Sequence, residues 1–121
     1  MLVSMVLGLI IGNVILKNLI QRARPCWIDT NILLLIPKPT DYSFPSGHTL
    51  ASFEAAIMIL LHNKKWGIPA IIFAILIAFS RMYLFVHFPT DILGGIIIAA
   101  GISIAVYYGY EKIKNKKTIK Q

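Results

Sequence analysis

Acidic side chains are scarce in this sequence, which contains 5 Asp and Glu residues against 12 Lys and Arg residues. The five acids are scattered, and no cluster of Asp, Glu, His or Cys has the spacing of a metal site. We therefore expect a protein that uses no metal and no cofactor. The single cysteine, Cys26, excludes an internal disulfide.

Charged residues of either sign are also few, at 14% of the chain, whereas 57% of the residues are hydrophobic and the mean hydropathy is +0.73. A single soluble domain of 121 residues cannot bury so much apolar surface, so the composition indicates a membrane protein. The net charge of +7 does not indicate a nucleic-acid partner, because the basic residues lie at the ends of apolar runs.

Four apolar segments predict an all-α polytopic membrane helical bundle of about four transmembrane helices: residues 2–16, 49–62, 67–86 and 92–110. A spanning helix needs about 20 residues, so the second segment is long enough only if its helix begins near Ser46. Residues 1–111 are then one domain, and residues 112–121 form a basic cytoplasmic tail that we expect to fray into water. The short run Ile32–Ile36 is interpreted as an interfacial segment or a lid.

The basic residues predict how the chain crosses the membrane. One side would carry seven of them, namely Lys64, Lys65 and the five lysines of the tail. The other side would carry five: Lys17, Arg22, Arg24, Lys38 and Arg81. The positive-inside rule makes the first side cytoplasmic. Both termini are then expected in the cytoplasm, and the polar ends of the helices on the outer face of the cell membrane.

Three polar stretches would meet at this outer face, and the first is "KNLIQRARP". Lys17 and Arg24 are seven residues apart, a spacing that returns to nearly the same face of a helix after two turns. Two cations on one face suit a ligand with several anionic oxygens, and arginine grips phosphate with two hydrogen bonds. The alternative interpretation is that both are ordinary charges anchoring a helix end at the lipid headgroups.

The second stretch is "FPSGHTLASF". Pro45 ends the preceding chain and Ser46 is a good N-cap, so a helix is predicted to follow. Its N-terminus, with Gly47 beside it, would present free backbone N–H groups to an anion, within reach of His48. The alternative is a capped helix start that happens to include a histidine.

The third stretch is "SRMYLFVHFPTD", where ionisable groups stand in an otherwise apolar segment and are therefore functional candidates. Pro89 is expected in the first turn of the last helix. Asp91, four residues after His87, can accept a hydrogen bond from one ring nitrogen and so make the other a better nucleophile. The alternative is a polar pair that closes a helix junction, which leaves Arg81 without a partner.

Taken together, the stretches supply three cations and a helix N-terminus for a phosphate, two histidines, and a carboxylate that orients one of them. Phosphoryl transfer without a metal takes its charge neutralisation from Lys and Arg. Glu54 stands outside this set. It is interpreted either as a partner for a basic group such as Lys17 or as a lining of a polar cavity.

At this point the sequence resembles the type 2 phosphatidic acid phosphatase (PAP2) family, which is related to the vanadium haloperoxidases. The family pattern is K-x6-R-P, then P-S-G-H, then S-R-x5-H-x3-D. Every position of this pattern is present here, from Lys17 to Asp91. The resemblance implies five phosphate-binding residues: Lys17, Arg24, Ser46, Gly47 and Arg81.

The resemblance also implies three catalytic roles. His87 would attack phosphorus and form a phosphohistidine, and Asp91 would orient His87. His48 would protonate the leaving alkoxide and then serve as base for the water that hydrolyses the intermediate. The implied substrate is a lipid phosphate at the membrane: phosphatidic acid, phosphatidylglycerophosphate or undecaprenyl diphosphate.

One departure from the family concerns its spanning helices, which usually number six, whereas four are predicted here and the first two are lacking. The alternative function is therefore a catalytically inactive, truncated member that binds anionic lipid or a partner. Gly8 and Gly12 form a GxxxG pattern. This pattern favours packing within the chain, with a homo-oligomer as the alternative.

Overall fold

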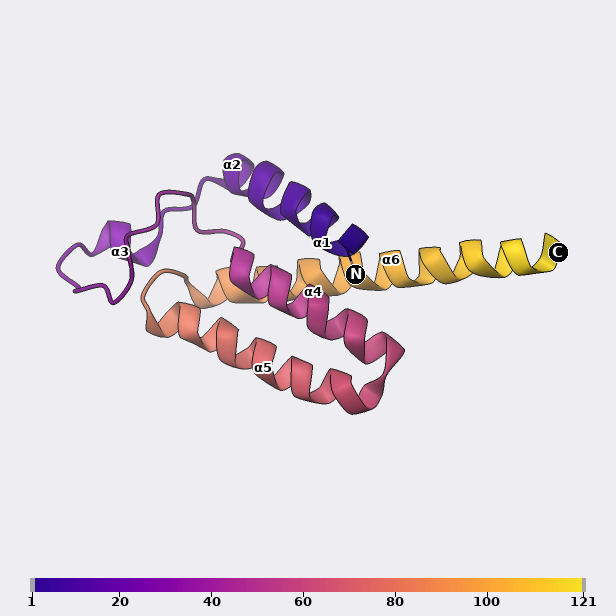
Figure 1. The fold of residues 1–121 in the computed structure, drawn as a ribbon. Coiled ribbons are helices and arrows are strands. Elements are labelled where there is room, and N and C mark those ends of the chain that lie inside the picture. The colour runs from indigo at the N-terminus through magenta and orange to yellow at the C-terminus, as the bar shows by residue number, and fades with distance from the viewer. Residues whose placement is uncertain (1, 121) are drawn as a thin grey trace.

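The computed structural model describes residues 2–120, and the side chains of residues 2–117. All regular structure in this part of the chain is helical. The elements are α1 (Leu2–Gly8), the π-helix η1 (Leu9–Leu16), α2 (Lys17–Ile20), α3 (Pro25–Ile28), α4 (Gly47–His62), α5 (Lys64–Tyr83) and α6 (Pro89–Lys120). The first three follow one another without a break and form one rod (Figure 1). The all-α bundle predicted from the sequence is confirmed.

The helix ends follow from local sequence. Gln21 adopts a left-handed conformation (φ 54°) and ends α2, as residues after a helix commonly do. The Ser46 hydroxyl accepts a hydrogen bond from the N–H of Thr49 (3.4 Å), so the predicted N-cap of α4 is confirmed. Pro89 is the first residue of α6, also as predicted. These caps fix where the polar stretches meet the helices.

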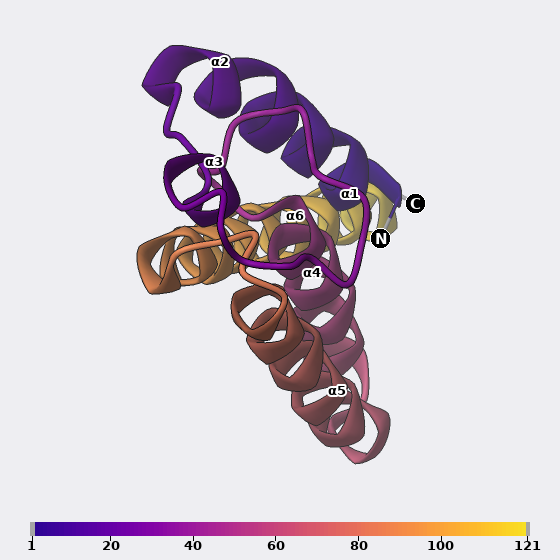
Figure 2. The same ribbon diagram turned by 90° about the vertical axis from the view of Figure 1, so that its left-hand side faces the viewer.

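Helix α4 lies at the centre of the bundle. It forms a hairpin with α5 through Asn63, whose side-chain oxygen accepts a hydrogen bond from the N–H of Lys65 (3.0 Å). It also packs against α6 and against the rod that begins at α1 (Figure 2). The buried core joins α4, α5 and α6 through Leu50, Phe53, Ala56, Ala74, Ala78, Ile92 and Ala99.

Three stretches of the described chain are long and apolar enough to cross a membrane: Leu2–Ile28, Lys64–Tyr83 and Pro89–Lys117. The second predicted span does form a helix, α4, but its 16 residues make it shorter than the others. Large apolar side chains on the outside of the bundle are exposed, among them Leu2 at 80% and Phe73 at 66%. Exposure of this kind is typical of helices whose outer faces contact lipid.

One expectation about the C-terminal tail differs from the structure. The tail was expected to be irregular, but α6 continues as a helix to Lys120 and projects beyond the other helices (Figure 1). This prediction was wrong because the lysines of the tail are good helix formers that extend a helix already nucleated. The run Ile32–Ile36 belongs to an irregular loop, with Leu33 89% exposed, and its role as an interfacial segment or a lid stays a prediction.

The GxxxG glycines pack within the chain, as favoured from the sequence. A Cβ atom on Gly8 would lie 1.9 Å from Glu54 Oε1, and one on Gly12 would lie 2.4 Å from Leu50 Cδ2. Both glycines therefore let the first rod approach α4 more closely than any larger residue would. Association with a second chain stays a prediction.

We predict that Gly67→Ala destabilises the α4–α5 hairpin. A Cβ atom there would lie 2.2 Å from the Cα atom of Leu60, a backbone atom that cannot rotate away. Overpacking of this kind costs about 1–3 kcal/mol. The matched control is Gly109→Ala, where the added atom meets nothing within 4 Å. Thermal unfolding in detergent should show a lower midpoint for Gly67→Ala than for the wild type, and no lowering for Gly109→Ala. Equal midpoints for the two variants would contradict the tight packing of the hairpin.

Candidate active site

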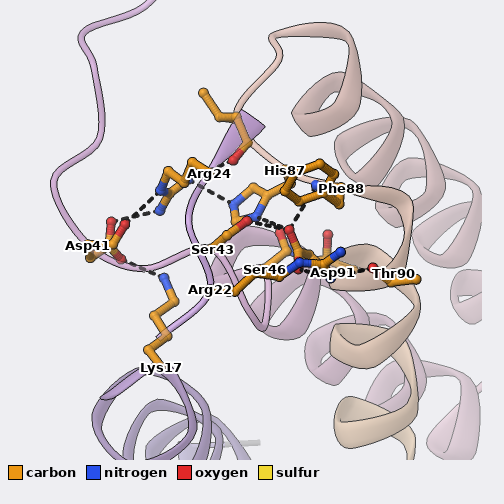
Figure 3. A network of polar contacts seen from close by, with 12 residues as sticks. Lys17, Arg22, Arg24, Asp41, Ser43, Ser46, His87, Phe88, Thr90 and Asp91 are labelled. Carbon is orange, nitrogen blue, oxygen red and sulfur yellow. Dashed lines mark hydrogen bonds and ion pairs between the residues drawn. The ribbon is translucent and has the colours of Figure 1, made fainter. Parts of the chain in front are cut away.

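The three polar stretches meet at one end of the bundle, where the loops connect α2 to α4 and α5 to α6 (Figures 1 and 3). A pocket of about 390 Å³ opens there, and six of the eight predicted site residues line it: Lys17, Arg24, Gly47, His48, Arg81 and His87. The other two, Ser46 and Asp91, are fully buried, and the N–H of Ser46 donates to the carbonyl of Asp91 (3.3 Å). All eight residues are therefore brought together.

Lys17 and Arg24 reach the pocket by a different route from the one predicted. They were expected on one helical face, which is wrong because the helix ends at Gln21 and Arg24 lies beyond it as the N-cap of α3. The carboxylate of Asp41 joins them instead: its Oδ2 lies 2.5 Å from Lys17 Nζ and its Oδ1 lies 2.7 Å from Arg24 Nη2.

Asp41 was not identified from the sequence, and its position in the loop before α4 was the only signal. Partial burial opposes ionisation of this carboxyl, but Lys17 and Arg24 outweigh that effect and lower its pKa. The Asp41 side chain is 57% exposed, so water screens the interaction. An ionised carboxylate thus holds the two cations at the mouth of the pocket, in a geometry that also suits two phosphate oxygens.

The contacts of His87 define which ring nitrogen carries the proton. Arg24 Nη1 lies 3.2 Å from His87 Nε2, and since a guanidinium only donates, Nε2 must accept. The proton of the neutral ring is then on Nδ1, which lies 3.5 Å from Asp91 Oδ2. Burial lowers the pKa of His87, and nearby Arg24 lowers it further, although Asp91 opposes both. The ring is therefore neutral near pH 7, with its lone pair directed toward the cations.

Behind His87, the carboxylate of Asp91 is 0% exposed and is held by several donors (Figure 3). Its Oδ2 accepts from the hydroxyl of Ser43 and from the N–H of Phe88 (2.8 Å). Its Oδ1 accepts from Arg22 Nη1 (3.0 Å). The sequence did not single out Ser43 or Arg22 as site residues, and Arg22 entered only as a charge beside the membrane.

Arg81 and His48 complete the pocket. The buried Nε of Arg81 has no hydrogen-bond partner within residues 2–117, so a charged donor at the pocket is left for an anion. His48 is the second residue of α4, beside the backbone N–H groups of its first turn. In the described residues, no group of three or more His, Cys, Asp or Glu residues lies together as a metal site would require.

Glu54 lies outside the pocket. It does not pair with Lys17, whose partner is Asp41, so that alternative was wrong. The Glu54 side chain is 1% exposed, packs on Gly8 and leaves Oε1 without a hydrogen-bond partner in the described chain. It lines a separate groove of about 280 Å³ between the first rod and α4, and this groove is mostly apolar.

These features define a helical membrane protein with a pocket lined by three cationic side chains and two histidines. The PAP2 superfamily model matches residues 1–115, and the chain belongs to this superfamily. It is 39% identical over 104 residues to an undecaprenyl-diphosphatase of Sulfolobus acidocaldarius, a match that covers 85% of this chain and 50% of the relative. It is 34% identical to phosphatidylglycerophosphatase B of Bacillus subtilis, covering 84% of this chain and 53% of that protein.

A solved structure is also similar, the PAP2 type phosphatidylglycerolphosphate phosphatase from Bacillus subtilis. The TM-score is 0.75 at 31% sequence identity, and the match covers 93% of this chain and 58% of that one. The fold is therefore that of a PAP2 membrane protein. The chain spans about half the length of the curated relatives it matches.

We predict that Asp41→Asn strengthens binding of inorganic phosphate, because it removes a negative charge that competes for Lys17 and Arg24. The dissociation constant should fall about two- to tenfold, the range expected for one partly exposed charge. Titration calorimetry on the detergent-solubilised protein measures it. Asp29→Asn is the control, since Asp29 is an exposed loop acid whose Oδ1 accepts from the N–H of Asn31 (3.1 Å). Weaker or unchanged binding by Asp41→Asn would contradict the competition between the Asp41 carboxylate and phosphate.

Proposed function

We propose that the protein is an integral-membrane, metal-independent phosphatase that hydrolyses a phosphate or diphosphate ester of a lipid through a phosphohistidine on His87. One observation carries the proposal: the unprotonated Nε2 of His87 faces a pocket lined by cations, while the carboxylate of Asp91 stands behind Nδ1. A nucleophile, its orienting group and charge neutralisation for phosphate are thus assembled in one place.

In the first step the phosphate group enters the pocket and its oxygens contact Lys17, Arg24 and Arg81, together with the N–H groups at the start of α4. His87 Nε2 attacks phosphorus in line with the ester oxygen, so that a P–N bond forms as the P–O bond breaks. The positive charge that develops on the ring is stabilised by Asp91, and the cations neutralise the phosphoryl oxygens.

His48 serves as acid and then as base. It donates a proton to the leaving oxygen, which departs as an alcohol or as a lipid monophosphate. It then removes a proton from water, and the resulting hydroxide attacks the phosphohistidine. The P–N bond breaks, inorganic phosphate leaves, and His87 returns to its neutral form.

The substrate is proposed to be a lipid presented from the outer leaflet, with its hydrocarbon chain remaining in the bilayer. The pocket lies at the end of the bundle away from the α4–α5 turn, which carries Lys64 and Lys65, so the positive-inside rule favours an extracytoplasmic site. Relatives named for undecaprenyl diphosphate and for phosphatidylglycerophosphate make these two lipids, with phosphatidic acid, the compounds to assay.

A second candidate function uses the same pocket, whose lining includes Lys17, Arg24 and Arg81. In this alternative the protein is a catalytically inactive member of the family that binds anionic lipid and does not hydrolyse it. Binding without phosphate release would distinguish this candidate from an enzyme.

We predict that the wild type releases phosphate from undecaprenyl diphosphate in the presence of a strong chelator and that vanadate inhibits it. His87→Ala should reduce the rate roughly a thousandfold or more, because the nucleophile is removed. His62→Ala is the matched control: this histidine lies at the far end of α4, against Tyr107.

Each other outcome has a definite meaning. Activity lost in chelator and restored by magnesium would refute the metal-independent mechanism. No release from any of the three lipids, together with binding of the same lipids in vesicles, would establish the inactive binder. An unchanged rate of phosphate release in His87→Ala would refute the proposed phosphohistidine intermediate.

We also predict that His48→Ala slows hydrolysis of alkyl phosphates at least about tenfold more than hydrolysis of p-nitrophenyl phosphate. A nitrophenolate leaves without protonation, so it needs no general acid in the first step. Steady-state kcat for the two substrates, compared between the wild type and the variant, measures this ratio. Equal slowing of both substrates would exclude His48 as the acid.

A further inference from the structure

Arg22 makes its contacts on the far side of Asp91 from His87. Its Nη1 donates to Asp91 Oδ1 (3.0 Å) and to the hydroxyl of Thr90, and its guanidinium lies 4.4 Å from the centre of the Phe88 ring. It therefore touches the residue before Asp91 and the residue after His87, as well as Asp91 itself (Figure 3). It does not line the pocket, whereas Arg24 does.

The two oxygens of Asp91 have different surroundings. Oδ2 accepts from Ser43 and from the N–H of Phe88, and it is the oxygen that faces His87 Nδ1. Oδ1 forms an ion pair with Arg22 Nη1 (3.0 Å). A carboxylate that is 0% exposed needs both a counter-charge and donors on each oxygen, because an uncompensated buried charge is strongly unfavourable.

Arg22 and Ser43 are also connected to each other. The N–H of Ser43 donates to the carbonyl of Arg22 (2.8 Å), so the segment after α2 and the segment before α4 are joined beside the carboxylate. The ring of Phe88 and the hydroxyl of Thr90 restrict how the guanidinium can turn. The carboxylate is thereby clamped at a fixed angle to the His87 ring.

We infer that Arg22 and Ser43 are positioning residues: they hold the Asp91 carboxylate so that Oδ2 retains the Nδ1 proton of His87 and Nε2 is kept as the nucleophile. This inference rests on the proposed function. Neither residue is among those that line the pocket, so both act on the rate of attack and not on substrate affinity. Neither belongs to the signature positions that identify the family in this sequence.

The kinetic test compares Arg22→Ala, Arg22→Lys and Ser43→Ala with the wild type on the best lipid substrate. Arg22→Ala should lower kcat about 10- to 100-fold, the effect of losing one hydrogen bond to a buried charge, with KM changed less than about twofold. Arg22→Lys should recover part of the loss, because it keeps the charge but not the planar fork. Ser43→Ala should lower kcat several-fold.

Two features make the kinetic test specific. The Arg22 side chain is 36% exposed, so millimolar guanidinium should reach the cavity left in Arg22→Ala and restore part of kcat. Lys38→Ala is the matched control, since it removes an exposed basic residue of the loop between α3 and α4. The control should change neither kcat nor its response to guanidinium. A rise in KM with kcat unchanged would make Arg22 a phosphate ligand and overturn the inference, as would an unchanged kcat.

A second measurement keeps the inference independent of turnover. Nitrogen-15 NMR of the His87 ring, assigned with His87→Ala, should show the Nδ1-protonated form in the wild type and a shifted Nδ1–H signal in Arg22→Ala and Ser43→Ala, because Asp91 Oδ2 is no longer held beside that proton. This holds even if no lipid is hydrolysed, so a failure of the proposed function is distinguishable from a failure of the clamp. If Arg22→Ala does not fold, Arg22→Lys and Ser43→Ala supply the answer. An identical Nδ1–H signal in all folded variants would refute the role.

Discussion

The buried carboxylate of Asp91 is the interaction on which the arrangement of this site depends. Its side chain receives Arg22 from the segment after α2, Ser43 from the segment before α4, and the N–H of Phe88 from the turn before α6. Its own carbonyl accepts the N–H of Ser46, the N-cap of α4. One residue thus ties together the three stretches that carry the cationic and histidine side chains of the pocket.

This dependence has a physical cause in the electrostatics of burial. The pocket contains more cations than anions, and cations lower the basicity of a nearby histidine, as Arg24 does for His87. A histidine made less basic is neutral and available, but it is also a poorer nucleophile. In the proposed mechanism Asp91 offsets this, because a carboxylate behind Nδ1 supports the positive charge that the ring acquires when Nε2 attacks. The cations would then bind phosphate without disabling the group that attacks it.

Much of the fold and of the site followed from the sequence because the signals were local. The caps at Ser46 and Pro89, the apolar segments and the spacing from His87 to Asp91 depend on neighbouring residues alone. Asp41, Arg22 and Ser43 did not follow, since their partners lie 17 to 69 residues away and only the closed loops bring them together. The prediction that Lys17 and Arg24 share a helical face was wrong for the same reason. The helix ends at Gln21, and both side chains instead meet through a loop residue, Asp41.

The polar contacts at the site also determine how the helices of the bundle pack against one another. Apolar helices in lipid gain little from the hydrophobic effect when they pack, so close approach through small residues has to hold them together. Gly12 and Gly95 provide this on either side of α4: a Cβ atom would lie 2.4 Å from Leu50 on one side and 3.2 Å from the carbonyl of Ser46 on the other. Contacts of this kind do not by themselves fix the position of one helix along the axis of its neighbour. The hydrogen bonds to Asp91 do fix this position, because each donor has to meet its acceptor at one point along the helix axis. Asp91, the proposed orienting group of His87, therefore also sets the register of the helices around it.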